Sequence, residues 1–331
     1  MIVSAHPLPP LAGLRTGVTL VDRSAWGRLR LSGTDVADLL NRLSTNLVAA
    51  LAAGSGLATV IVTNKGRIVD WVRLFALADG SHLLLTSPGQ SACVAAWIDL
   101  YLFTEEVTVV DESATGSLVG VFGRDATEAL LAACVAGGQI PTRPGDSTIV
   151  RIGDSSAVLM RADLAGVPEI VVLADDATVT RLAGALEAAG AAWVGVDAVE
   201  RLRISCGVPA MGSELGEQFN PLEARLQAFV HFTKGCYVGQ EVIARLHNYD
   251  KVKRLLMVVC CNRELHPGDA LLFDGQEVGQ VTSAASRPEG GWVGLAYIAT
   301  RCASPGLEVG VAGRGAVATM SDPPFLLGLP S

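Results

Sequence analysis

The pattern of apolar residues changes near Tyr249, and this change constrains the fold of the chain. Before that point, segments with helical spacing are interleaved with segments that read as strands. After it, short alternating apolar runs are separated by Gly, Pro and Asp, at residues 255–260, 270–273, 277–282, 292–298 and 307–311. Such runs predict an all-β domain, most simply a small barrel or sandwich. Since 331 residues are too many for one ordinary core, we expect two or three domains, with a boundary near Tyr249.

The chain before Tyr249 predicts an α+β fold. Residues 14–31 predict a strand, a turn and a second strand, and Thr34 or Asp35 can cap a helix that follows. That helix would carry apolar residues at positions 36, 39, 40 and 43. Further strands are expected at 58–62, 67–76, 82–86, 104–110, 117–122, 147–152, 157–161 and 169–173, and further helices at 91–100, from 123 to about 136, at 175–190 and at 196–204.

Charge and cysteine content argue against several classes of function. A net charge of −8 and an isoelectric point of about 5.2 disfavour bulk attraction to nucleic acid, so direct nucleic-acid binding is not expected. Seven cysteines occur without a Cys-x-x-Cys pair, and no metal site is predicted. Met1–Pro10 lacks the pattern of a signal peptide, and no apolar stretch is long enough to span a membrane. We therefore expect a cytoplasmic protein without membrane contact.

The run from Lys234 to Glu241 (Lys-Gly-Cys-Tyr-Val-Gly-Gln-Glu) carries the strongest chemical signal. It places the Cys236 thiol between two glycines, with a cation before it and helix-compatible residues after it. This pattern predicts a tight loop that leads into a helix, with the sulfur near the helix N-terminus, where backbone N–H groups favour a thiolate. Cys236 is therefore a candidate nucleophile, metal or cluster ligand, or redox sensor. A small buried residue that packs a turn is the alternative interpretation.

Asp70 is the second candidate for chemistry, because it interrupts an otherwise apolar strand. A carboxylate there is costly unless it is paired or faces a cavity. Lys65, Arg67 or Arg73 could pair with it, and solvation at a sheet edge is the alternative. A buried and unpaired Asp70 would have a raised pKa and could exchange a proton with a substrate amine.

The run from Lys234 to Glu241 resembles the signature of the YgfZ folate-binding proteins, which are similar to the aminomethyltransferase (T protein) of the glycine cleavage system. The resemblance extends to residues 21–24, 31–35, 40–46, 62–70 and 199–204, and so covers most of the chain. It implies a T-protein-like α+β fold of three domains around a central opening for tetrahydrofolate, with a C-terminal β-barrel. We expect a folate-binding domain over residues 1–115 and 196–249, an α+β (ferredoxin-like) domain over 116–195, and the β-barrel domain over 250–331.

The resemblance also implies roles for single residues. Asp70 matches the aspartate that lies beside the folate nitrogen accepting the one-carbon unit, so Asp70 and Cys236 are the expected catalytic residues. Where the family has a glutamate that binds the pterin ring, this chain has Ser205, which supplies no charge, and Glu200 or Glu223 would have to compensate. The expected contacts to tetrahydrofolate, or to a one-carbon derivative of it, come from Asn64, Arg67, Asp70, Ser205, Lys234, Tyr237, Gln240 and Glu241.

Two functions follow from the resemblance. The first is a YgfZ-type tetrahydrofolate-binding accessory protein whose partners are iron–sulfur enzymes, including those that modify tRNA, or cluster-assembly proteins. The Cys236 motif favours this function, because glycine-cleavage chemistry needs no such thiol. The second is a tetrahydrofolate-dependent aminomethyltransferase or demethylase, which Asp70 favours. A scaffold that has lost folate, as Ser205 permits, is a third interpretation.

Overall fold

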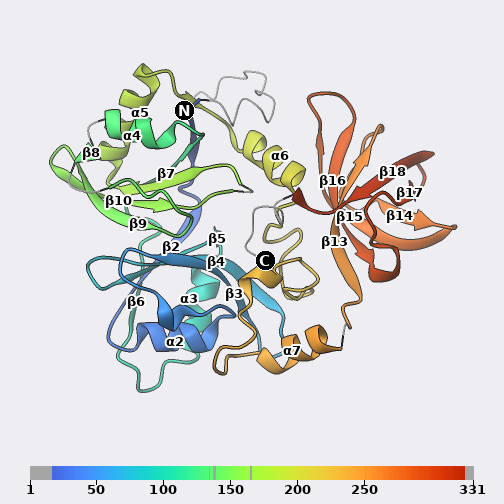
Figure 1. The fold of residues 1–331 in the computed structure, drawn as a ribbon, viewed down its shortest axis with the longest axis horizontal. Coiled ribbons are helices and arrows are strands. Elements are labelled where there is room, and N and C mark those ends of the chain that lie inside the picture. The colour runs from blue at the N-terminus through green and yellow to red at the C-terminus, as the bar shows by residue number, and fades with distance from the viewer. Residues whose placement is uncertain (1–16, 134, 137–138, 165, 250, 325–331) are drawn as a thin grey trace. The chain divides into compact units, whose positions relative to one another are not determined.

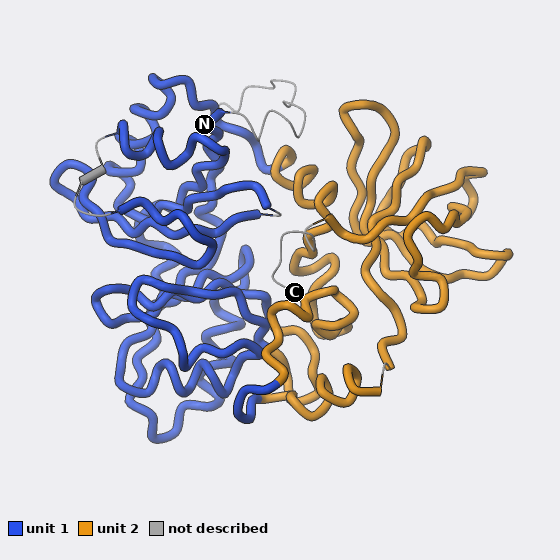
Figure 2. Tube along the Cα trace, viewed as in Figure 1, with its two compact units in different colours: residues 1–61, 70–196, 233–237 blue, residues 62–69, 197–232, 238–331 orange. Residues whose placement is uncertain are grey.

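The computed structural model describes residues 17–324 except 134, 137, 138, 165 and 250. The segment Met1–Pro10, where no signal peptide is expected, and Cys134 lie outside the described residues. The chain forms two compact units, which Figure 2 shows in different colours. Unit 1 comprises residues 1–61, 70–196 and 233–237, and unit 2 comprises residues 62–69, 197–232 and 238–331.

The first sheet has five strands in the order β3-β4-β5-β2-β6 and lies mainly in unit 1 (Figure 1). Its strands are β2 (Trp26–Ser32), β3 (Gly56–Val62), β4 (Ile68–Ala76), β5 (His82–Pro88) and β6 (Thr108–Asp111). Two helices accompany it, α2 (Val36–Leu43) and α3 (Ser91–Asp99). Helix α2 buries the four apolar residues that its spacing predicted, so the helix itself is confirmed. Asp35 takes the N-cap position, but its side chain makes no capping hydrogen bond and accepts instead from the backbone N–H of Glu106 at 2.8 Å, so the predicted side-chain cap was wrong.

The second sheet of unit 1 has seven strands in the order β12-β1-β7-β11-β10-β9-β8. Its strands are β1 (Thr19–Asp22), β7 (Ser117–Phe122), β8 (Val135–Ala136), β9 (Ser147–Ile152), β10 (Ser155–Arg161), β11 (Glu169–Ala174) and β12 (Ala192–Trp193). Strand β1 pairs antiparallel with β7, so a strand from the start of the chain completes a sheet formed mainly by residues 117–174. The division into domains at residues 115, 195 and 249 stays a prediction.

The helix expected from residue 123 to about 136 is α4 (Ala126–Ala132), and the prediction was wrong at its end. The alanine-rich sequence continues the helical spacing, but Val135 and Ala136 pair with β9 instead. Pairing at the edge of a sheet thus overrides the local helix propensity.

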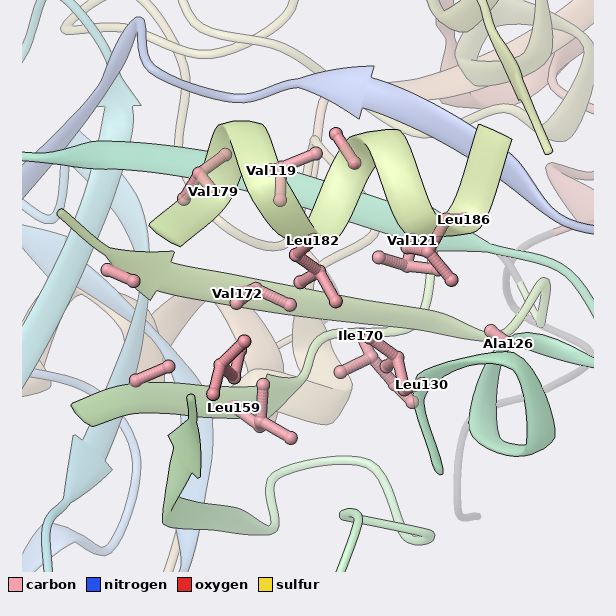
Figure 3. Close-up of a cluster of buried hydrophobic side chains, with 14 of the residues drawn as sticks. Val119, Val121, Ala126, Leu130, Leu159, Ile170, Val172, Val179, Leu182 and Leu186 are labelled. Atoms are coloured by element: carbon pink, nitrogen blue, oxygen red, sulfur yellow. The ribbon is translucent and has the colours of Figure 1, made fainter. Parts of the chain in front are cut away.

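Helix α5 (Asp176–Ala188) covers the seven-stranded sheet. The Asp175 carboxylate caps it by accepting a hydrogen bond from the backbone N–H of Thr178 at 2.8 Å. One face of the helix packs on the strands and forms the core drawn in Figure 3, where the buried residues include Val179, Leu182, Leu186, Val119, Val121, Ile170 and Val172.

A separate cluster of buried apolar side chains joins the two sheets of unit 1. It contains residues from β4 and β5 of the five-stranded sheet and from β7, β10 and β11 of the seven-stranded sheet, among them Phe75, Leu83, Leu85, Leu118, Met160 and Val171. The partly buried indole of Trp26 packs against this cluster.

Unit 2 contains a closed barrel of six strands in the order β13-β16-β15-β14-β17-β18. They are β13 (Arg254–Cys261), β14 (Ala270–Phe273), β15 (Gln276–Ser286), β16 (Trp292–Ala299), β17 (Glu308–Val311) and β18 (Ala316–Ser321). Helices α6 (Val196–Cys206) and α7 (Gln240–Asn248) precede it. The predicted C-terminal β-barrel is therefore confirmed. Among the described residues, no helix is both long enough and apolar enough to cross a membrane.

Candidate functional site

The side chain of Lys234 is buried and holds the start of the motif in place. Its ammonium group donates hydrogen bonds to the carbonyl oxygens of Asn41 (2.6 Å), Ser44 (2.9 Å) and Asn46 (2.5 Å). These carbonyls belong to the last turn of α2 and to the residues just after it, where a helix leaves acceptors without internal partners. A cation at this end also interacts favourably with the helix dipole. Burial lowers the pKa of Lys234 to about 8.

Cys236 and its neighbour Gly235 are exposed, whereas Lys234 and Tyr237 on either side of this pair are buried. Tyr237 is only 8 % exposed, and its ring centre lies 5.2 Å from the Lys234 ammonium nitrogen. Burial raises the pKa of Tyr237 to about 12. The loop thus has a buried attachment on each side of Gly235 and Cys236, and the thiol is accessible. The alternative interpretation of Cys236 as a small buried packing residue is wrong.

The helix predicted to follow the motif is present. Helix α7 starts at Gln240, and Gly239 takes its N-cap position with a left-handed backbone (φ 81°). Cys236 therefore lies four residues before the first helical residue, in the loop that leads into the helix. Gln240 is half-buried, and the exposed Glu241 forms an ion pair with Arg245 at 2.8 Å on the helix surface.

The Asp70 carboxylate lies in β4 and is completely buried. Its two oxygens accept hydrogen bonds from the backbone N–H groups of Trp71 (2.8 Å) and of Ser87 in the adjacent strand β5 (2.9 Å). In the described part of the chain, no lysine or arginine forms an ion pair with Asp70. Burial raises its pKa above the ordinary value, although these hydrogen bonds and the charge of Arg73 oppose the shift. The expectation of a raised pKa for a buried, unpaired Asp70 is confirmed.

Arg67 belongs to a polar cluster in unit 2. Its guanidinium donates to the carbonyl oxygen of Gln218 at 3.2 Å and lies 4.0 Å from the carboxylate of Glu223. Arg254 approaches the other oxygen of the same carboxylate at 3.4 Å. The Glu223 side chain is buried, and its two carboxylate oxygens face two arginines. Asn64 is exposed in the turn between β3 and β4.

Ser205 is half-buried in helix α6, at the position where the resemblance implies a glutamate. Glu200, on the same helix, pairs with Arg203 at 2.8 Å, and Glu223 is held by the two arginines described above. Both glutamates considered as replacements are therefore engaged in ion pairs. Cys206, which follows Ser205, is buried.

Glu214 in unit 2 is a buried carboxylate that the sequence patterns did not indicate. It is completely buried and accepts hydrogen bonds from Arg203 (2.9 Å) and from the hydroxyls of Thr282 and Ser283 (2.6 Å each). The Tyr297 hydroxyl donates to its backbone carbonyl at 2.7 Å. Its partners lie in the barrel strands β15 and β16 and in helix α6, so no local spacing reveals them. With its acceptors occupied by these donors, Glu214 joins helix α6 to the barrel.

The predicted site residues are divided between the two units. Asp70, Lys234, Cys236 and Tyr237 belong to unit 1, whereas Asn64, Arg67, Ser205, Gln240 and Glu241 belong to unit 2. Within unit 1, Lys234 and Tyr237 are in contact. Among the described residues, no group of three or more His, Cys, Asp or Glu side chains is arranged to hold a metal ion.

Comparisons with known proteins match almost the whole chain. The model of the GCVT N-terminal domain family matches residues 11–234, and that of the glycine cleavage T-protein C-terminal barrel domain matches residues 253–326. A candidate chloroplastic transferase of Arabidopsis thaliana is 31 % identical over 312 residues, which cover 94 % of this chain and 72 % of that protein. An aminomethyltransferase of Symbiobacterium thermophilum is 27 % identical over 326 residues, which cover 94 % of this chain and 87 % of that protein.

A solved structure supports the same assignment at the level of the fold. The glycine cleavage system aminomethyltransferase T from Bartonella henselae superposes with a TM-score of 0.83 at 21 % identity, covering 95 % of this chain and 88 % of that one. The T-protein-like fold expected from the sequence is therefore confirmed, including the closed barrel at its C-terminal end. With both family models matched in chain order, this protein belongs to the glycine cleavage T-protein-like superfamily.

Proposed function

We propose that this protein is a tetrahydrofolate-binding accessory protein of the YgfZ type. It would support cluster assembly or repair in iron–sulfur enzymes, including ones that modify tRNA, and would act through the Cys236 thiol. The observation that carries the proposal is the contrast inside the motif, where Cys236 is exposed while Lys234 and Tyr237 are buried. Only an accessible sulfur can reach a cluster or a cysteine of a partner protein.

The attachment of the loop gives this thiol a defined position. Three hydrogen bonds from one ammonium group tie Lys234 to the end of α2, and the Tyr237 ring packs beside that group. A residue between two such attachments loses much of its backbone freedom before any partner binds. Less entropy is then lost on binding, which favours a specific encounter.

Folate binding is supported by membership in the superfamily, since members of this family bind tetrahydrofolate. For this chain we propose Asn64, Arg67, Asp70, Ser205, Lys234, Tyr237, Gln240 and Glu241 as contacts, with Ser205 as the weak one because it brings no charge. Isothermal titration with tetrahydrofolate tests this part directly. Ser205→Glu, which restores the charge that the resemblance implies, should bind tetrahydrofolate more tightly than the unmodified protein. An absence of binding by both proteins would leave only the scaffold interpretation.

The role of the thiol is tested in cells that lack this protein. Cys236→Ala should fail to restore the activity of iron–sulfur enzymes, whereas Cys93→Ala should restore it fully. Cys93 is a suitable control because it is also an exposed free cysteine in unit 1. Full rescue by Cys236→Ala at equal protein level would disprove the proposed role of the thiol.

A tetrahydrofolate-dependent aminomethyltransferase or demethylase is the second candidate. The buried Asp70 carboxylate favours it, because its raised pKa suits proton exchange with an amine. The assay measures methylenetetrahydrofolate formed from an aminomethyl donor, with the unmodified protein and with Asp70→Asn. Turnover that disappears in Asp70→Asn would establish this activity, and no turnover by either protein would exclude it.

A further inference from the structure

Arg73 in strand β4 stacks on aromatic rings, but its hydrogen-bond donors are unused. Its guanidinium carbon lies 4.7 Å from the ring centre of Trp26 and 5.9 Å from that of Trp71. Stacking of this kind satisfies the faces of the guanidinium, whereas its five N–H donors point outward in the plane of the group. Within the part of the chain that the structure describes, none of these donors has a hydrogen-bond acceptor and no carboxylate pairs with Arg73.

The carboxylates around Arg73 are all bound by other groups. Glu169 is completely buried and accepts two hydrogen bonds from Arg23, at 2.8 and 3.2 Å. Asp163 accepts two hydrogen bonds from Arg161. Asp70 accepts its hydrogen bonds from backbone N–H groups. Arg73 therefore remains the cation without a counter-charge in this cluster.

Arg28 in the same unit has hydrogen-bond acceptors for its guanidinium and so offers a comparison with Arg73. The buried Arg28 of β2 directs its guanidinium at backbone carbonyl oxygens, including those of Glu112 (3.2 Å), Ser113 and Gly116 (3.3 Å). Arg73 is only half-buried and has no such shell of acceptors among the described residues, so the donor edge of its guanidinium is open to an external partner. The donors of Arg28 are bound by backbone carbonyls, whereas those of Arg73 have no acceptor in the described part of the chain. This difference points to an external acceptor for Arg73.

The local charge balance selects the kind of acceptor. The charges of Arg161 and Asp163 cancel, and Arg23 and Arg73 face two buried carboxyl groups, those of Glu169 and Asp70. The cluster therefore carries at most one positive unit, which it reaches when Asp70 is protonated. A monoanion balances this charge, whereas a dianion overcompensates it. A carboxylate also matches the planar donor edge of a guanidinium with two parallel hydrogen bonds.

We propose that Arg73, with the indole of Trp26 beside it, forms a binding site in unit 1 for a small carboxylate monoanion. The carboxylate would accept two hydrogen bonds from the free edge of the guanidinium. Two sources share this chemistry, a free carboxylate metabolite and the carboxylate-bearing tail of a larger molecule such as a folate. The inference depends on neither the thiol nor the pterin contacts proposed above.

The experiment is a titration of the full chain with three probes, followed by tryptophan fluorescence because Trp26 and Trp71 flank Arg73. Benzoate and p-aminobenzoylglutamate should bind saturably, and inorganic phosphate should bind about tenfold more weakly or not at all. A p-aminobenzoylglutamate affinity well above that of benzoate assigns the site to a folate-type tail. Equal affinities assign it to free carboxylates.

Arg73→Gln should weaken carboxylate binding by about tenfold or more, because the loss of a charged hydrogen-bond pair costs at least this much. Arg143→Gln is the control, since the Arg143 side chain is 86 % exposed and should leave binding unchanged. Arg73→Lys keeps the charge but loses the paired donors, so its carboxylate affinity should lie between those of the unmodified protein and Arg73→Gln. This variant also tests the site if Arg73→Gln does not fold. Non-saturable binding, tighter binding of phosphate, or equal binding by the arginine and lysine forms would overturn the proposal.

Discussion

The ammonium nitrogen of Lys234 lies 2.9 Å from the carbonyl oxygen of Ser44, the residue that ends helix α2, although the two are 190 positions apart in the sequence. Two further carbonyls, of Asn41 and Asn46, share the same cation. The first residue of the motif thus closes a helix formed near the start of the chain. The position of Cys236, two residues later, follows from this attachment.

Replacement of Lys234 by Met should destabilise the protein strongly. The variant keeps the length of the side chain but leaves three carbonyl oxygens without their charged donor, which we expect to cost about 2 to 4 kcal/mol. Lys65→Met is the control, because Lys65 is exposed in a turn and should change the free energy of unfolding by less than about 0.5 kcal/mol. Urea unfolding measures both, and equal stability of the two variants would contradict this account.

Substitution by alanine should affect stability differently at the two glycines of the motif. Gly239 has φ 81°, and a Cβ there would lie 2.4 Å from the carbonyl oxygen of Thr63, so Gly239→Ala should lose about 1 to 3 kcal/mol. A Cβ on Gly235 would meet no atom within 4 Å. Gly235→Ala should therefore leave the free energy of unfolding nearly unchanged in a urea titration. Similar losses of unfolding free energy in both variants would contradict the left-handed backbone at Gly239 and the open space beside Gly235.

Local spacing in the sequence was sufficient to predict much of the fold. The four buried residues of α2 repeat at helical intervals, and the barrel strands β15 and β18 alternate between buried and more exposed residues, so these elements carry their own signal. The ends of elements were less predictable, as α4 shows, because pairing of Val135 with β9 depends on a distant strand.

The candidate site was predictable in its residues but not in their partners. The motif indicated Lys234 and Cys236, but nothing in its spacing reveals that the lysine binds carbonyls of α2 rather than acting beside the thiol. The ion pair of Arg23 with Glu169 joins residues 146 positions apart and has no local pattern. Arg73 was considered only as a partner for Asp70, since its stacking on Trp26 depends on the order of strands in the sheet.

Asp70→Asn should change how stability depends on pH. Burial raises the pKa of Asp70 in the folded state above its unfolded value of about 4. The folded state then holds the proton more tightly, so this stabilisation is complete below pH of about 4 and is lost as the pH rises through the folded pKa. Asparagine does not ionise, and the variant should therefore gain stability relative to the unmodified protein as the pH increases from about 4 to 8.

Asp79→Asn provides the control for this pH effect. The hydrogen bond from Ser81 lowers the pKa of Asp79, so its contribution is present above pH of about 4 and is lost only at lower pH. The difference between this variant and the unmodified protein should stay level from pH 4 to 8. Urea unfolding at several pH values measures both variants, and a level difference for Asp70→Asn as well would mean that Asp70 is not titrating as a buried acid.

Glu169→Gln should be among the most destabilising changes of a single charge in unit 1. Glu169 is completely buried and takes two hydrogen bonds from Arg23, so its neutralisation leaves a buried guanidinium without a counter-charge, at a cost of about 3 to 5 kcal/mol. Glu241→Gln removes an exposed pair with Arg245 and should cost less than about 0.5 kcal/mol. The double variant Arg23→Met with Glu169→Met removes both charges together and should be more stable than Glu169→Gln alone, because no unpaired charge then remains buried. Thermal and urea unfolding of the three variants distinguish the cost of an unpaired charge from the loss of a contact. A double variant that is less stable than Glu169→Gln would show that the ion pair itself, or the stacking of Arg23 on Trp26, stabilises the fold.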